Sequence, residues 1–189
     1  MERVYIFDTT LRDGGQTKGV DFSFADKIAI SEALDDLGID NIEGGWPGAN
    51  PTDDKLFGSP PKLKVSNFVA FGMTRRPSTS AANDPGLNAV LSGKSDSVCL
   101  VGKTWDFHVS KALNITLEEN IDMISESINE INKRGKQALF DCEHFFDGFK
   151  NNKKFALECV RSAFEAGAKW VVLCDTNGGT LPHEITKII

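Results

Sequence analysis

The sequence predicts an α/β fold with a parallel sheet, and it favours a (β/α)8 TIM barrel of which about six βα units are present. Apolar, β-rich runs alternate with helical patterns, which indicates parallel strands covered by helices. A unit of helix, glycine, apolar strand and carboxylate recurs, and its carboxylates are Glu43, Glu143 and Asp175. Strand-end acids converge at a barrel mouth, whereas a doubly wound sheet, the competing architecture, forms its site mainly at one switch point.

The first half of the chain is expected to contain four strands. Each is a short apolar run that stops at glycine or at a polar residue: residues 4–7, 39–43, 65–71 and 97–101. Between the first two strands, Ser23 and Asp26 form a capping pair for a helix that ends at Gly38. The stretch Trp46–Pro51 is rich in turn formers, and residues 85–91 form a helix or an irregular segment.

The second half is expected to contain two more strands, at residues 137–142 and 169–174. A capping box at Thr116–Glu119 begins the clearest amphipathic helix, which ends at Gly135. Further helices are expected at residues 152–166 and 180–189. A complete barrel has eight strands and typically about 250 residues, so this sequence corresponds to a partial catalytic barrel domain over residues 1–189 that holds strands one to six.

Composition excludes several classes of protein. The net charge is −6 and no stretch is strongly basic, which argues against nucleic-acid binding. No apolar run is long enough to span a bilayer, and the amino terminus does not resemble a signal peptide. The four cysteines include no CxxC pair, which favours free thiols in a reduced, cytoplasmic protein.

Arg12 and Asp13, which follow the first predicted strand, are the adjacent pair that most strongly indicates a functional site. A carboxylate there suits a hard divalent cation, and a neighbouring guanidinium suits a substrate carboxylate or a developing oxyanion. A structural salt bridge explains the pair equally well. Glu43, Glu143 and Asp175 have a similar alternative as capping or salt-bridging acids, but their equivalent positions favour a site.

Glu143 stands out among these acids because His144 and two phenylalanines follow it, an environment that can raise a carboxyl pKa and suit it to proton transfer. Thr176 is a neutral hydrogen-bond donor at the end of the sixth strand. The three histidines are not at the spacing of metal-ligand pairs, so each is expected to be structural or on the surface: His108, His144 and His183.

Five motifs resemble the citramalate synthases, in the superfamily of 2-isopropylmalate synthase, homocitrate synthase and hydroxymethylglutaryl-CoA (HMG-CoA) lyase. The resemblance covers nearly the whole chain, and the EGGWPG and EHFFDG strings indicate the citramalate branch. The motifs are DTTLRDGGQ at Asp8–Gln16, IEGGWPGANP at Ile42–Pro51, GKTWDFHV at Gly102–Val109, FDCEHFFDGFK at Phe140–Lys150 and LCDTNGGTLPHEI at Leu173–Ile185.

The resemblance implies a barrel with a divalent metal (Mg²⁺, Mn²⁺ or Zn²⁺) at its mouth. It also implies an acyltransferase that condenses acetyl-CoA with pyruvate, a 2-keto acid, and then hydrolyses the thioester to give citramalate for isoleucine biosynthesis. It assigns Arg12 to the keto-acid oxygen, Asp13 to the metal and Glu143 to activation of the acetyl methyl group. It places three further residues in the substrate pocket: Gln16, Glu43 and Thr176.

Two departures from the family pattern affect these expectations. Gly15 stands where relatives often carry Glu or Ala. The HxH pair that completes the family's metal site, at the end of the seventh strand, has no counterpart in these residues, and His183 does not match it. We therefore expect an incomplete fragment that binds metal weakly and is inactive alone.

Several alternatives to a citramalate synthase remain open from the sequence. They are a 2-isopropylmalate or homocitrate synthase, a lyase of the HMG-CoA type, and a non-catalytic piece that pairs its open sheet edge with a second copy. We expect a homo-oligomer with no membrane or nucleic-acid partner.

Overall fold

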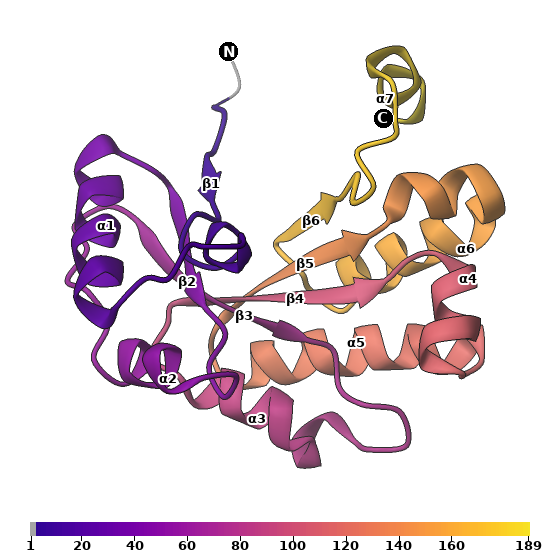
Figure 1. The fold of residues 1–189 in the computed structure, drawn as a ribbon. Coiled ribbons are helices and arrows are strands. Elements are labelled where there is room, and N and C mark those ends of the chain that lie inside the picture. Colours follow the sequence, from indigo (N-terminus) through magenta and orange to yellow (C-terminus); the bar gives the residue numbers. More distant parts are fainter. Residues whose placement is uncertain (1–2) are drawn as a thin grey trace.

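The computed structural model describes residues 3–189 and shows one six-stranded parallel sheet in the order β1-β2-β3-β4-β5-β6. The strands are β1 Phe7–Asp8, β2 Asn41–Gly45, β3 Asn67–Met73, β4 Ser97–Lys103, β5 Gln137–Glu143 and β6 Trp170–Leu173. The sheet curls into a half-barrel whose edges are β1 and β6 (Figure 1). Because the strands follow chain order, the barrel interpretation is confirmed and the doubly wound alternative is wrong.

The helices other than α7 cover the convex side of the curved sheet, and α7 stands apart beyond β6 (Figure 1). They are α1 Phe24–Leu37, α2 Pro51–Gly58, α3 Pro85–Ser92, α4 Asp106–His108, α5 Leu117–Lys133, α6 Phe145–Glu165 and α7 Pro182–Ile188. Short turns of other helix types cover Gly14–Gln16, Ala81–Asn83 and Val109–Leu113. The amphipathic helix expected after Thr116 is confirmed as α5, and its cap is the Thr116 hydroxyl, which accepts a hydrogen bond from the Glu119 amide.

Several boundaries differ from those expected. The first strand, expected at residues 4–7, pairs with β2 only at Phe7 and Asp8. The second and third strands begin and end two residues later than expected. The helix expected at residues 152–166 already begins at Phe145 and is kinked at Asn152. Helix α2 was not expected; Asn50 caps it and Pro51 occupies its first turn, where a missing amide proton costs nothing.

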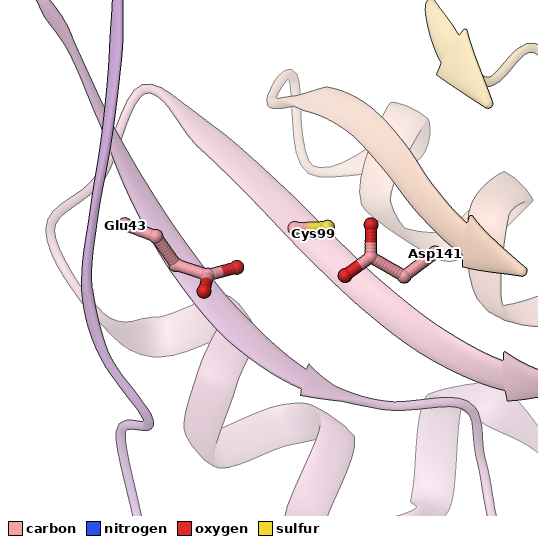
Figure 2. A group of neighbouring side chains, drawn as sticks. All are labelled: Glu43, Cys99 and Asp141. Atoms are coloured by element: carbon pink, nitrogen blue, oxygen red, sulfur yellow. The ribbon is translucent and has the colours of Figure 1, made fainter. Parts of the chain in front are cut away.

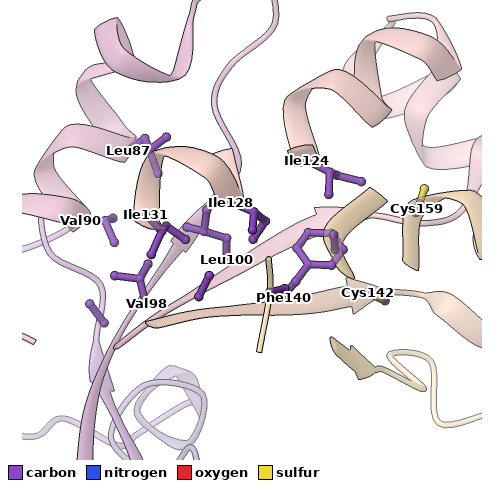
Figure 3. Close-up of a cluster of buried hydrophobic side chains, with 14 of the residues drawn as sticks. Leu87, Val90, Val98, Leu100, Ile124, Ile128, Ile131, Phe140, Cys142 and Cys159 are labelled. Atoms are coloured by element: carbon purple, nitrogen blue, oxygen red, sulfur yellow. The ribbon is translucent and has the colours of Figure 1, made fainter. Parts of the chain in front are cut away.

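The main hydrophobic core lies between the sheet and α5 with its neighbouring helices (Figure 3). Ile124, Ile128 and Ile131 on α5 are fully buried against strand residues such as Leu100 and Phe140. A smaller cluster of Val69, Cys99 and Leu139 fills the inner side of the sheet. Within residues 3–189, no helix is long and apolar enough to cross a membrane.

The two edges of the half-barrel approach each other near the amino ends of the strands. The rings of Tyr5, just before β1, and Trp170, at the start of β6, lie 5.1 Å apart between centroids. Trp170 and Val172 remain partly exposed on β6, and Cys99 and Leu139 are buried on the central strands β4 and β5. The inner surface is therefore packed at the centre of the sheet and open at its β6 edge.

Asp35 at the end of α1 ties that helix to the start of β3. Its carboxylate accepts the backbone N–H groups of Lys64, Val65 and Ser66 at 2.8, 2.9 and 2.8 Å. These hydrogen bonds hold the pKa of Asp35 well below its ordinary value. Because the carboxylate is favoured in the folded state, its stabilising contribution is present above about pH 4 and is lost as the pH falls further.

We expect Asp35→Asn to lower the midpoint of thermal unfolding at neutral pH, and we expect this difference from wild type to shrink between about pH 4 and pH 2. The matched control is Asp36→Asn, whose carboxylate forms an exposed ion pair with Lys64. A midpoint difference for Asp35→Asn that stayed constant down to about pH 2 would contradict this assignment.

Candidate functional site

A cavity of about 1110 Å³ opens at the carboxyl ends of the strands. Five of the six residues assigned to the site by sequence line it: Arg12, Asp13, Gln16, Glu143 and Thr176. The sixth, Glu43, is 0% exposed and lies behind Arg12. The loops after β1, β5 and β6 therefore bring these side chains to one mouth, as the barrel rule requires.

Arg12 is held on three sides. Its Nε donates to Oε2 of Glu43 at 2.6 Å, and its Nη1 donates to Oδ1 of Asp13 at 3.1 Å. Its guanidinium carbon lies 3.9 Å from the ring centre of Phe71, a cation–π contact. The structure thus contains the Arg12–Asp13 ion pair, and it places that pair on the cavity wall. A guanidinium has five N–H donors, so three donors remain for a ligand.

Glu43, Cys99 and Asp141 form a buried group on the inner side of the sheet (Figure 2). One ligand atom of each lies within 4.8 Å of the others. Burial raises the pKa of Glu43 to about 7, against the opposing effect of Arg12, and burial also raises the pKa of Asp141 and of the Cys99 thiol. Asp141 and Cys99 were not among the residues predicted from the sequence, because each lies inside a strand rather than at its end.

Glu143 ends β5 and forms an ion pair with Lys103, which ends β4. The two residues are register partners, so their side chains point to the same face. The Lys103 carbonyl accepts a hydrogen bond of 2.9 Å from the buried Asn120 amide, which fixes the strand end. Sequence reasoning did not select Lys103, because the fourth strand was expected to stop at Val101. Extending the alternation Ser97, Cys99, Val101 by one step would have found it.

Thr176 is held next to Glu143 by a hydrogen bond to the backbone of His144, the residue that follows Glu143. Its Oγ1 accepts the backbone N–H of His144 at 2.9 Å, which leaves the hydroxyl proton free to be donated. His144 has a positive φ of 55°, a conformation that few residues other than glycine adopt. Its ring packs against His108 at 4.5 Å and its Nδ1 lies 3.1 Å from Asp147. These contacts fit the structural roles expected for both histidines.

Asp175 is not the N-cap of α7, which is Leu181; instead Asp175 closes the loop between β6 and α7. Its two carboxylate oxygens accept the backbone N–H and the hydroxyl of Thr180 at 3.0 and 2.9 Å, and these bonds lower its pKa. The recurring strand-end acid therefore has three different environments. Glu43 is buried on Arg12, Glu143 is paired with Lys103 in the cavity, and Asp175 closes a loop.

Gly148 in the first turn of α6 packs directly on the strand end that carries Lys103. A Cβ atom on Gly148 would overlap the carbonyl oxygen of Thr104, the residue after Lys103. We expect Gly148→Ala to cost about 1–3 kcal/mol in the free energy of unfolding, because backbone atoms cannot move aside as a flexible side chain can. Urea denaturation would measure it.

The control for this change is Gly58→Ala in α2, where an added Cβ meets nothing within 4 Å. Alanine is a better helix former than glycine, so Gly58→Ala should be neutral or slightly stabilising. Equal stability of the Gly148→Ala variant and wild type would contradict the close packing of α6 on Thr104.

A family model described as HMGL-like matches residues 3–189. The chain belongs to the HMGL-like family. Among curated relatives of this family member, the (R)-citramalate synthase of Aquifex aeolicus is 51% identical over 189 residues, covering 99% of this chain and 36% of the relative. The (R)-citramalate synthase of Sulfolobus acidocaldarius is 47% identical, with 98% and 36% covered. The 2-isopropylmalate synthase of Halalkalibacterium halodurans is 30% identical, with 100% and 35% covered.

Solved structures of similar shape agree with the partial barrel. The HMG-CoA lyase of Bacillus subtilis superposes with a TM-score of 0.80 at 19% identity, covering 98% of this chain and 62% of that one. The HMG-CoA lyase of Brucella melitensis gives a TM-score of 0.77 at 20% identity, with 100% and 66% covered. At these identities the likeness concerns the fold. This HMGL-like chain spans about a third of the length of the curated relatives that it matches.

Proposed function

We propose that residues 1–189 are the amino-terminal part of the catalytic barrel of a citramalate synthase. The reaction is the condensation of acetyl-CoA with pyruvate, followed by hydrolysis of the thioester to citramalate and free CoA. The observation that carries this proposal is the convergence of Arg12, Asp13, Glu143 and Thr176 on one cavity. The 51% identity to an (R)-citramalate synthase over the whole chain supports the choice of reaction within the family.

In this proposal Glu143 is the general base. Its carboxylate takes a proton from the acetyl methyl group, and Lys103 holds that carboxylate at the cavity wall through their ion pair. The resulting enolate carbon attacks the keto carbon of pyruvate. The free N–H groups of Arg12 stabilise the alkoxide that forms, and the Thr176 hydroxyl donates to the keto acid. Water then cleaves the thioester and releases CoA.

Asp13 fits the role of metal ligand. Its side chain is 66% exposed at the cavity, and Arg12 contacts only Oδ1, so Oδ2 is available to a cation. A carboxylate oxygen suits Mg²⁺ or Mn²⁺, and Zn²⁺ also accepts it. When bound, such an ion would polarise the oxygens of the keto acid. With Asp13 as the single assigned ligand, we propose that residues 1–189 alone hold the ion weakly.

We also propose that the protein is cytoplasmic and forms a homo-oligomer. All four cysteines are free thiols, which suits a reducing compartment. Phe164 on α6 is 69% exposed, which supports further packing of this helix against another part of the protein or a second copy.

A chimaera tests the proposed function. The amino-terminal segment of the Aquifex aeolicus synthase that aligns with this chain would be replaced by residues 1–189. We expect the chimaera to release CoA from acetyl-CoA with pyruvate and Mg²⁺ or Mn²⁺, and to form citramalate. The chain alone, assayed beside it, should give no release.

The substrate comparison separates the alternatives. Preference for 2-ketoisovalerate would favour a 2-isopropylmalate synthase, preference for 2-ketoglutarate would favour a homocitrate synthase, and cleavage of HMG-CoA would favour a lyase. A folded chimaera that acts on none of these compounds would overturn the proposed function.

A further inference from the structure

Glu43, Cys99 and Asp141 lie on β2, β4 and β5 and point toward one another on the inner side of the sheet (Figure 2). The group supplies one thiol and two carboxyls, and its ligand atoms lie within 4.8 Å of one another. It lies behind Arg12, whereas Asp13 projects into the cavity at the mouth. The mechanism proposed above uses none of these three side chains directly.

The carboxylate of Glu43 has one satisfied and one unsatisfied oxygen. Oε2 accepts from Arg12, and Oε1 is buried with no hydrogen-bond partner in the described part of the chain. The side chain is 0% exposed, so solvent does not compensate for the missing partner. An unpaired buried carboxylate oxygen is costly, and the Glu43 carboxylate points toward Cys99 and Asp141 (Figure 2), so the group offers a position for a cation.

The charges around the group also favour a cation. Arg12 is the basic residue that forms an ion pair with Glu43, and it also forms an ion pair with Asp13. No lysine, arginine or histidine within residues 3–189 forms an ion pair with Asp141. If both carboxyls and the thiol were ionised, their negative charges together with that of Asp13 would exceed the single positive charge of Arg12, and a dication would offset most of the excess.

We propose that Glu43, Cys99 and Asp141 bind a thiophilic divalent cation such as Zn²⁺, at a site separate from the ion that Asp13 would hold. One sulfur with two oxygens is a donor set that Zn²⁺ accepts and that Mg²⁺ does not favour. On binding, a bond forms between Sγ of Cys99 and the cation, and the thiol proton leaves to water. Asp141 also lines the cavity, so an ion can enter from the mouth.

A bound cation would act on the main cavity through Glu43. Oε1 would contact the cation while Oε2 continues to accept from Arg12, an arrangement in which one carboxylate fixes both partners. The site would therefore fix the orientation of the arginine at the cavity wall. It would also cross-link β2, β4 and β5 from the inner side of the half-barrel.

Cobalt provides a direct test on the purified 189-residue chain. Co²⁺ takes the place of Zn²⁺, and a cobalt–thiolate bond gives a charge-transfer absorption that oxygen ligands alone do not give. We expect the absorption to rise to one equivalent of Co²⁺ in wild type and to be displaced by Zn²⁺. Cys99→Ser should abolish it. Asp13→Asn should retain it, because that carboxylate belongs to the other site.

Cys174→Ser is the matched control, because Cys174 lines the cavity but is not in the group. Far-ultraviolet circular dichroism checks that each variant folds. Glu43→Gln, which keeps the shape of the side chain, is a second variant. We expect it to lower the Co²⁺ affinity, measured from the absorption titration, at least tenfold. A second measurement is the unfolding midpoint, which Zn²⁺ should raise in wild type and not in Cys99→Ser.

Absence of the thiolate absorption in folded wild type would overturn the proposal and leave a proton shared between Glu43 and Asp141 as the explanation. Loss of the absorption in Cys174→Ser or Asp13→Asn would also overturn it. The readout requires no substrate, so its failure is distinct from failure of the proposed synthase activity.

Discussion

Lys27→Met is expected to lower the free energy of unfolding by about 3–5 kcal/mol, because it leaves a buried carboxylate without its cation. Lys27 and Asp53 are 6% and 5% exposed and form an ion pair between α1 and α2. Lys27 also donates to the Gly44 carbonyl at 2.9 Å, and Asp53 accepts from the Trp46 amide at 2.9 Å. The Lys27–Asp53 pair therefore fixes the end of β2 and the start of the loop that follows it. Glu43, which contacts Arg12, lies in the same strand. Urea denaturation would measure the loss.

The matched control is Lys64→Met. Lys64 and Asp36 form an ion pair of the same type, but their side chains are 77% and 68% exposed. Exposed pairs contribute about 0–1 kcal/mol, so this variant should stay close to wild type. The double variant Lys27→Met with Asp53→Asn should lose less than the sum of the single changes, since each single change leaves the other partner unpaired. If Lys27→Met and Lys64→Met lowered the free energy of unfolding equally, burial would not explain the contribution of the Lys27–Asp53 pair.

Glu143→Gln in the active chimaera is expected to reduce kcat by about 10²–10⁴-fold, the usual contribution of a general base. Glutamine keeps the shape of the side chain and can still accept a hydrogen bond from Lys103, but it cannot take a proton from the acetyl methyl group. The KM for acetyl-CoA should change much less than kcat, because the variant retains the cavity. Steady-state release of CoA measures both constants.

Exchange of the acetyl methyl protons with deuterium in heavy water gives a second readout for Glu143. The chimaera should catalyse this exchange, and Glu143→Gln should slow the exchange about as much as it slows turnover. Glu158→Gln on the exposed side of α6 is the control and should leave both rates unchanged. Full exchange in Glu143→Gln would mean that another group removes the proton.

Sequence patterns alone predicted the six strands, most of the outer helices and the mouth at which strand ends meet, but not α2. Alternation of apolar strands with amphipathic helices is a local pattern, and residues such as Ile124 and Ile128 reveal their buried face by spacing. The position of Arg12, Asp13, Glu143 and Thr176 at strand ends was also readable, because parallel strands in a barrel bring these ends together.

The tertiary structure decided which side chains meet. Asp175 and Glu143 occupy equivalent places in the sequence, but Thr180 engages the first and Lys103 the second. The start of a strand also shifts when a distant side chain hydrogen-bonds to the backbone there, as the Asp35 carboxylate does with the Ser66 N–H just before β3. The contacts of Glu143 and Asp35 join residues that lie 40 and 31 positions apart in the chain.

The group of Glu43, Cys99 and Asp141 has the same origin. These residues lie on three strands separated by about forty residues or more of chain, and the curvature and register of the sheet place them within reach of one another. The sequence by itself determined the order of the elements and the chemistry at the strand ends. Only the tertiary structure decided the pairs and the buried group, because these depend on long-range packing and register that no local pattern encodes.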